Sequence, residues 1–103
     1  MVKEINEEEF KNEVLANEGV CVVDFFAEWC PPCKMLSPEF EKVSEGYENI
    51  KFFKVDTDKN MELATKYKIE LVPTVIFFKN GQEVKRESGY ITKEELKQMI
   101  EGL

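Results

Sequence analysis

Two cysteines, Cys30 and Cys33, are separated by two prolines and follow an apolar run over residues 20–27. An apolar run of this length is typical of a strand that is buried on both faces. The prolines cannot extend the strand, because each lacks a backbone N–H, but they suit the first turn of a helix. We therefore expect Cys30 at a helix start and Cys33 one turn later, a spacing at which two cysteines can form a disulfide.

The start of a helix favours a thiolate over a thiol, because it carries partial positive charge and free N–H groups. We assign Cys30 as the nucleophile, since it should lie nearer to the helix start and to solvent, and Cys33 as the residue that resolves a mixed disulfide. A metal site is disfavoured, because the chain has no histidine and only one further cysteine. That cysteine, Cys21, lies among valines and is expected to be inert core. The pair predicts a redox switch.

The elements around the pair follow from hydrophobic periodicity, caps and turn residues. Helices are predicted over residues 7–17, 31–47 (with Pro38 inside), 60–68 and 93–103, and strands over residues 2–5, 20–27, 50–55, 74–78 and 83–88. Alternating strands and helices predict parallel pairings, and the turn at Asn80 and Gly81 adds an antiparallel one. We therefore predict one α/β domain over residues 1–103, in which a mixed central sheet is flanked by helices on both faces.

The composition argues against several kinds of partner. The chain has 14 basic and 21 acidic residues, and its net charge of −7 opposes binding to nucleic acid or to an anionic membrane. No apolar run approaches the roughly 18 residues of a membrane span. The first nine residues contain no apolar signal segment, so we expect a cytoplasmic protein.

The cysteine motif lies within a longer pattern at residues 23–34. Further short motifs follow it along the chain: Pro38, residues 54–56, residues 72–74, residues 80–81 and Gly89. A C-x-x-C motif that follows a buried strand and opens a helix is typical of the thioredoxin family. Together with the other motifs, it makes the sequence resemble that family over nearly its full length. The resemblance implies the thioredoxin fold and a general protein-disulfide reductase that acts, as a monomer, on disulfide-containing substrate proteins. It also implies that no cofactor is bound and that a partner thioredoxin reductase supplies the electrons.

Two positions depart from the family pattern. Pro31 stands where the family usually has glycine, and Phe26 stands where it commonly has tryptophan. Pro31 removes a backbone donor near the thiolates but stiffens the loop, so the sequence leaves the change in redox potential open. The alternatives are therefore a disulfide oxidant or isomerase, a thioredoxin-like maturation factor with an altered redox potential, and a thioredoxin-fold binding module with incidental thiols.

Asp24 is the one charged residue in the apolar strand. It either faces solvent near the strand end, with no special role, or is buried with a raised pKa. A buried Asp24 could take the proton that Cys33 must lose, and the chain offers no histidine for this task. The resemblance gives Asp24 the same role as general base. Lys54 is its candidate partner, although a lysine in a strand is more often simply exposed.

The remaining candidates should form a substrate groove beside the disulfide. By sequence alone Pro73 is an ordinary trans proline, whereas the resemblance implies a cis peptide that leaves the backbone of Val72 free to pair with an extended peptide. Trp29 is either a core aromatic or the flat apolar wall of the groove. The residues assigned to substrate binding are Trp29, Pro31, Pro32, Val72, Pro73 and Gly89.

Overall fold

A five-stranded sheet organises the chain, with its strands in the spatial order β1-β3-β2-β4-β5. The computed structural model describes residues 1–103. The strands are β1 (Val2–Glu4), β2 (Val20–Phe26), β3 (Lys51–Asp56), β4 (Thr74–Lys79) and β5 (Gln82–Ser88). The helices are α1 (Glu7–Phe10), continued by a π-helical segment (Lys11–Leu15), α2 (Pro31–Ser44), α3 (Met61–Lys66) and α4 (Lys93–Glu101). None of them is both long and apolar enough to cross a lipid bilayer.

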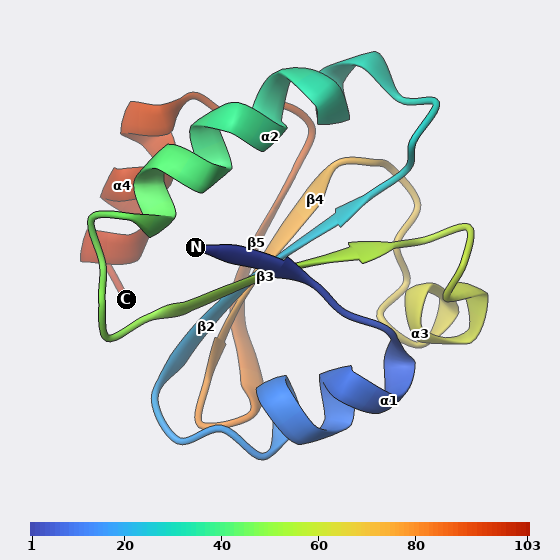
Figure 1. Cartoon of the computed structure of the whole chain (residues 1–103), viewed down its shortest axis with the longest axis horizontal. Helices are drawn as coiled ribbons and strands as arrows, with labels where there is room; N and C mark the ends of the chain where they lie inside the picture. The colour runs from blue at the N-terminus through green and yellow to red at the C-terminus, as the bar shows by residue number, and fades with distance from the viewer.

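The sheet lies between two apolar cores. Alternate residues of its strands point into one core or the other, because side chains along a strand alternate between its two faces. Figure 1 shows α2 and α4 on one face of the sheet and α1 on the other. The core under α2 and α4 contains Val22, Leu36, Phe40, Val43, Phe52, Val75, Phe77, Ile91, Leu96 and Ile100. The core on the opposite face contains Ile5, Phe10, Val14, Cys21, Val23, Phe25, Phe53, Val55, Leu63, Ile76 and Phe78. Strands β2 and β4 are therefore buried on both faces, as predicted.

Reciprocal side-chain caps begin two of the helices, and a tight turn joins β4 to β5. The Asn6 side chain accepts a hydrogen bond from the Glu9 N–H, and the Glu9 carboxylate accepts one from the Asn6 N–H. Thr92 and Glu95 form the same reciprocal pair at the start of α4. Asn80 and Gly81 both have positive φ, 53° and 80°, which is the backbone that a tight hairpin with a type I′ turn requires.

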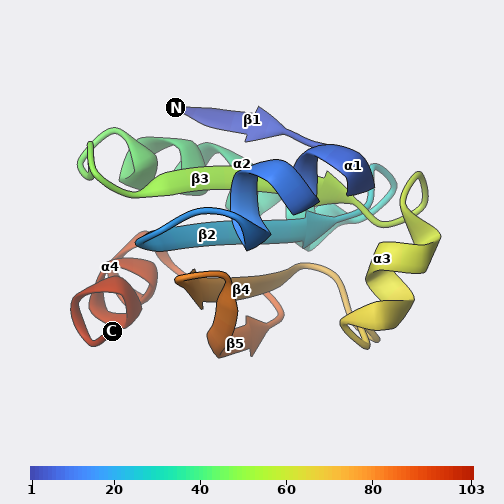
Figure 2. The ribbon, with the colours of Figure 1, turned by 90° about the horizontal axis from the view of Figure 1, so that it is seen from below.

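The sheet is mixed, as predicted, but it has a second antiparallel pairing that the alternation of elements did not predict. Strands β1 and β2 both run parallel to β3, whereas β4 runs antiparallel to β2 as well as to β5. Figure 2 shows the reason: α3 is short and lies beyond the end of the sheet at which β3 finishes. The chain re-enters the sheet from that same end, so the residues before β4 lie close to the end of β2.

Candidate active site

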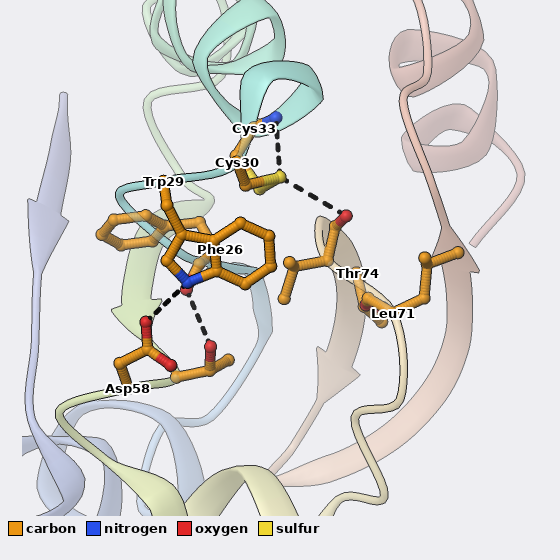
Figure 3. Close-up of a disulfide and its surroundings, with 9 residues drawn as sticks. Phe26, Trp29, Cys30, Cys33, Asp58, Leu71 and Thr74 are labelled. Carbon is orange, nitrogen blue, oxygen red and sulfur yellow. Dashed lines mark hydrogen bonds between the residues drawn. A yellow bond between two sulfur atoms is a disulfide. The ribbon is translucent and has the colours of Figure 1, made fainter.

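Cys30 is the N-cap residue of α2, and Cys33 lies in the first turn, as the sequence predicts. Pro31 and Pro32 occupy the first two helical positions, where a missing N–H removes no helical hydrogen bond. The two cysteines have Cα atoms 5.3 Å apart and form a disulfide. The Cys33 N–H donates a hydrogen bond to Cys30 Sγ over 3.3 Å, as Figure 3 shows. The helix start therefore directs a backbone donor at the sulfur of Cys30.

The expectation that Cys30 lies nearer to solvent than Cys33 is wrong. The exposed fractions of the two residues are 2% and 3%, because Cys30 packs in a small cluster with Ala27 and Cys33, against Phe26 and Val72. The cysteines differ instead in the cavity that each one borders. Cys30 lines a cleft together with Val72, and Cys33 lines a separate cavity together with Asp24.

The cleft beside Cys30 has a volume of about 340 Å³ and is built from three segments of the chain. These segments are the end of the loop between β2 and α2 with the first turn of α2, the residue that follows β3, and the loop that precedes β4. The lining residues are Trp29, Cys30, Pro31, Pro32, Thr57, Ile69, Glu70, Leu71 and Val72. Four residues of the predicted groove therefore line this cleft, whereas Pro73 and Gly89 do not.

The indole of Trp29 stands at the surface beside the disulfide. Its exposed fraction is 68%, so the interpretation of Trp29 as a core aromatic is wrong. The indole Nε1–H donates a hydrogen bond to Asp58 Oδ2 over 2.9 Å (Figure 3), and this bond fixes the ring at the edge of the cleft. Sequence reasoning missed Asp58, because it lies in a polar turn with no local pattern that points to a tryptophan 29 residues earlier.

The peptide bond between Val72 and Pro73 is cis, as the family resemblance implied. The carbonyl oxygen of Val72 lies 3.5 Å from Cys30 Sγ, and neither the N–H nor the carbonyl of Val72 is bonded to another backbone group. The Gly89 N–H donates to the carbonyl oxygen of Pro73 over 2.7 Å. Gly89 thus holds the carbonyl of Pro73, while the N–H and carbonyl of Val72, which lack a backbone partner, lie next to the sulfur of Cys30.

Asp24 is buried, so the alternative that places it in solvent is wrong. Its Oδ1 atom has no hydrogen-bond partner. Burial raises the pKa of Asp24 to about 7, and the positive charge of Lys54 opposes part of that rise. Asp24 lines a cavity of about 300 Å³ together with Cys33 and Lys54. A carboxyl group that titrates near neutral pH thus shares a cavity with the second cysteine.

Lys54 lies beside Asp24 in the sheet, because the two residues are paired across β2 and β3. Its ammonium group lies 5.4 Å from the centroid of the Phe26 ring and forms no ion pair with the Asp24 carboxylate. On its other side, Lys54 is paired with Glu4 of β1, which also lines the cavity. Sequence reasoning missed Glu4, because its place beside Lys54 depends on the order of the strands.

Cys21 is the one cysteine outside the disulfide. Cys21 is buried in the core, as predicted, and burial raises the pKa of its thiol. No three side chains among the histidine, cysteine, aspartate and glutamate types come together in a way that could hold a metal ion.

Comparison with known proteins gives matches along nearly the whole chain. The family model described as "Thioredoxin" matches residues 1–102. The thioredoxin of Equus caballus is 44% identical over an alignment of 105 positions, which covers 100% of this chain and 99% of that protein. The thioredoxin of Mycoplasmoides gallisepticum is 39% identical, with 96% of this chain and 99% of that protein covered. The thioredoxin of Rickettsia bellii is also 39% identical, with 97% and 96% covered.

Proposed function

This chain belongs to the thioredoxin family, and we propose that it works through a reversible disulfide between Cys30 and Cys33. It is a thiol–disulfide oxidoreductase with protein-disulfide reductase activity. One observation carries the assignment of the residues: Cys30 caps the start of α2, and its disulfide partner lies in the first turn of that helix. This position supplies the positive end of a helix to one sulfur and a nearby second sulfur to accept the bond.

In the first step, the thiolate of reduced Cys30 attacks one sulfur of a substrate disulfide. A new bond forms between Cys30 Sγ and that sulfur, and the other substrate sulfur leaves as a thiolate. The Cys33 N–H, which is directed at Cys30 Sγ, and the start of α2 stabilise the attacking thiolate.

In the second step, Cys33 gives its proton to the Asp24 carboxylate and attacks Cys30 Sγ. The bond between Cys30 and the substrate breaks, the second substrate sulfur leaves as a thiolate, and two electrons have passed to the substrate. A pKa of about 7 suits a group that takes up a proton near neutral pH. The cavity that Asp24 and Cys33 share has room for water, through which the proton can travel. Lys54 supports the ionised form of Asp24.

The substrate lies in the cleft beside Cys30 as an extended segment. The N–H and carbonyl groups of Val72, which have no backbone partner within the protein, pair with the substrate backbone. The exposed indole of Trp29, with Pro31 and Pro32, forms the apolar wall. The hydrogen bond from the Gly89 N–H to the Pro73 carbonyl keeps the adjacent Val72 backbone in place. Pairing through backbone groups does not depend on the side chains of the substrate. We therefore expect the protein to act on a broad range of protein substrates.

The oxidised protein must be returned to its reduced form by an electron donor after each turnover. Residues 1–103 act as a single thioredoxin domain and as a monomer, with no bound cofactor, and a partner thioredoxin reductase returns Cys30 and Cys33 to thiols. We place the protein in the cytoplasm, among disulfide-containing substrate proteins. Its net charge of −7 argues against nucleic acid and anionic membranes as partners.

A redox titration that is monitored by the fluorescence of Trp29 tests the proposal. Trp29 is the only tryptophan of the chain and lies next to the disulfide. We expect one reversible two-electron transition near the potential of thioredoxin, about −270 mV, which would show that Pro31 is compatible with a reductase. A transition near that of the oxidant DsbA, about −120 mV, would contradict the reductase assignment. The double variant Cys30→Ser, Cys33→Ser is the control and should show no transition.

A further inference from the structure

Glu70 is the only charged residue among the nine that line the cleft beside Cys30. The cleft is otherwise formed by uncharged side chains, and two of them, Trp29 and Leu71, have exposed fractions of 68% and 55%. A single carboxylate in an otherwise uncharged, largely apolar cleft attracts cationic groups and repels anionic ones. Glu70 therefore gives the cleft a chemical preference that its apolar walls and free backbone groups lack.

Other acidic groups beside the cleft already have partners. The Glu28 carboxylate forms an ion pair with Lys59 over 3.7 Å, and Asp58 accepts the hydrogen bond from Trp29. Glu70 takes part in none of the four ion pairs of the structure. Its charge is therefore free to interact with a group that enters the cleft.

The position of Glu70 relative to Cys30 indicates where such a group would lie on a bound segment. Cys30 Sγ lies 3.5 Å from the carbonyl oxygen of Val72, so a substrate cysteine bonded to Cys30 lies beside Val72. Glu70 precedes Val72 by two residues, so the two residues lie at most about 7 Å apart along the chain, which two residues of an extended substrate can span. A substrate side chain about two positions from the reactive cysteine therefore lies near Glu70.

We propose that Glu70 makes this oxidoreductase prefer substrate segments that carry lysine or arginine about two residues from the reactive cysteine. This inference rests on the proposed function, since it takes the cleft beside Cys30 as the substrate site. The cationic head group lies against the Glu70 carboxylate, and the aliphatic stem covers the exposed apolar surface of Leu71. An acidic substrate residue at the same position is disfavoured by repulsion.

Three disulfide-linked peptide homodimers test the preference. They are identical except for lysine, glutamine or glutamate two residues on either side of the cysteine, and their symmetry makes the two sulfurs equivalent. Each is mixed with the reduced protein, which becomes the Cys30–Cys33 disulfide while the peptide becomes two thiols, and Trp29 fluorescence follows the single turnover. We expect the lysine peptide to react about fivefold faster than the glutamine peptide, the glutamate peptide to react slowest, and the differences to vanish near 1 M salt.

The variants separate the effect of Glu70 from that of the overall negative charge. Glu70→Gln should remove most of the preference, and Glu70→Lys should reverse it. Glu45→Gln removes the same charge at the far end of α2, about 20 Å from Cys30 along the helix, and should leave the preference intact. An undiminished preference in Glu70→Gln, or equal rates for all three peptides with the unmodified chain, would overturn the inference while the oxidoreductase assignment stands. If none of the peptides reacts, the proposed function itself fails and this inference fails with it.

Discussion

Asp24 of β2 lies directly across from Lys54 of β3. The two side chains emerge on the same face of the sheet and border the cavity that Cys33 also lines. Burial raises the pKa of Asp24, the charge of Lys54 opposes that rise, and the balance is a pKa of about 7. The carboxyl group can therefore exist in both protonation states near neutral pH, which is what a group that exchanges a proton with a thiol requires.

Replacing Asp24 by asparagine should stabilise the fold at neutral and alkaline pH. The pKa of Asp24 is raised from 3.8 to about 7 in the folded state, so between these values the folded chain binds more protons than the unfolded chain. The unmodified protein therefore loses stability as pH rises from about 4 to about 7, and Asp24→Asn removes that loss. We expect a gain of roughly 3–4 kcal/mol in the free energy of unfolding at pH 8, from urea titrations of the oxidised protein. A gain of the same size at pH 4 would contradict this account, and Glu45→Gln serves as the exposed control.

Replacing Lys54 by methionine should raise the pKa of Asp24, because it removes the charge that lowers it. Less Asp24 is then ionised at pH 7, so the resolving attack by Cys33 should become severalfold slower and its pH profile should move to higher pH. Stopped-flow measurement of the rate of the second step between pH 5 and 9 would detect this shift in the pH profile. Lys51→Met, at the start of the same strand and opposite Cys21, should leave the profile in place.

The two cysteines should give opposite results when each is replaced by serine. Cys33→Ser keeps the nucleophile but removes the resolving thiol, so it should accumulate a mixed disulfide with substrate that mass spectrometry detects. Cys30→Ser should lose turnover altogether and form no such adduct. Cys21→Ala should retain full turnover, because Cys21 lies in the core on the opposite face of the sheet. A Cys30→Ser variant with full turnover would show that the assignment is wrong.

Loss of the bond between Trp29 and Asp58 should slow the first step without disturbing the second. Asp58→Ala removes the acceptor of the indole N–H, which frees the ring at the edge of the cleft. A hydrogen bond of this kind contributes about 1 kcal/mol, so we expect an approximately fivefold lower rate of attack on a peptide disulfide. Asp58→Asn retains an oxygen acceptor and should behave almost as the unmodified chain does. Equal slowing in both variants would show that the charge of Asp58, rather than its bond to Trp29, is responsible.

The two glycines with positive φ next to β5 should differ in their tolerance of alanine. A Cβ at Gly81 would clash with the carbonyl oxygen of Leu15, whereas a Cβ at Gly89 would meet nothing within 4 Å. Gly89→Ala should therefore cost only the backbone strain, roughly 1–2 kcal/mol, and Gly81→Ala should cost clearly more. Thermal and urea unfolding measure both variants, and equal losses would show that the contact with Leu15 relaxes without cost.

Most of the fold was predictable because its signals are local. The capping pairs at Asn6 and Thr92, the turn at Asn80 and Gly81, and the prolines after Cys30 each act within a few residues, and the structure has all of them. The burial of Asp24 was left open, because a carboxylate near a strand end can face either way. The structure settles it, since α2 covers the face of the sheet on which Asp24 lies.

The parts that sequence reasoning missed depend on contacts between distant segments. The direction of β4 follows from where α3 lies, which no local pattern encodes. The bond between Trp29 and Asp58, the pairing of Glu4 with Lys54 and the place of Glu70 in the cleft arise only once the strands have assembled. The expectation that Cys30 lies at the surface failed for the same reason. The loop before β4 packs against Cys30, and this loop lies about 40 residues further along the chain.

The loop before β4, which helps to form the cleft beside Cys30, comes about 40 residues after the cysteines in the sequence. A nascent chain that ends at Ile69 already contains both cysteines, but it lacks Val72 and the strand that pairs with the free edge of β2. The wall of the cleft opposite Cys30 is therefore made only with the last third of the polypeptide. A chain that stops before Val72 would therefore carry both reactive cysteines without the complete cleft beside Cys30.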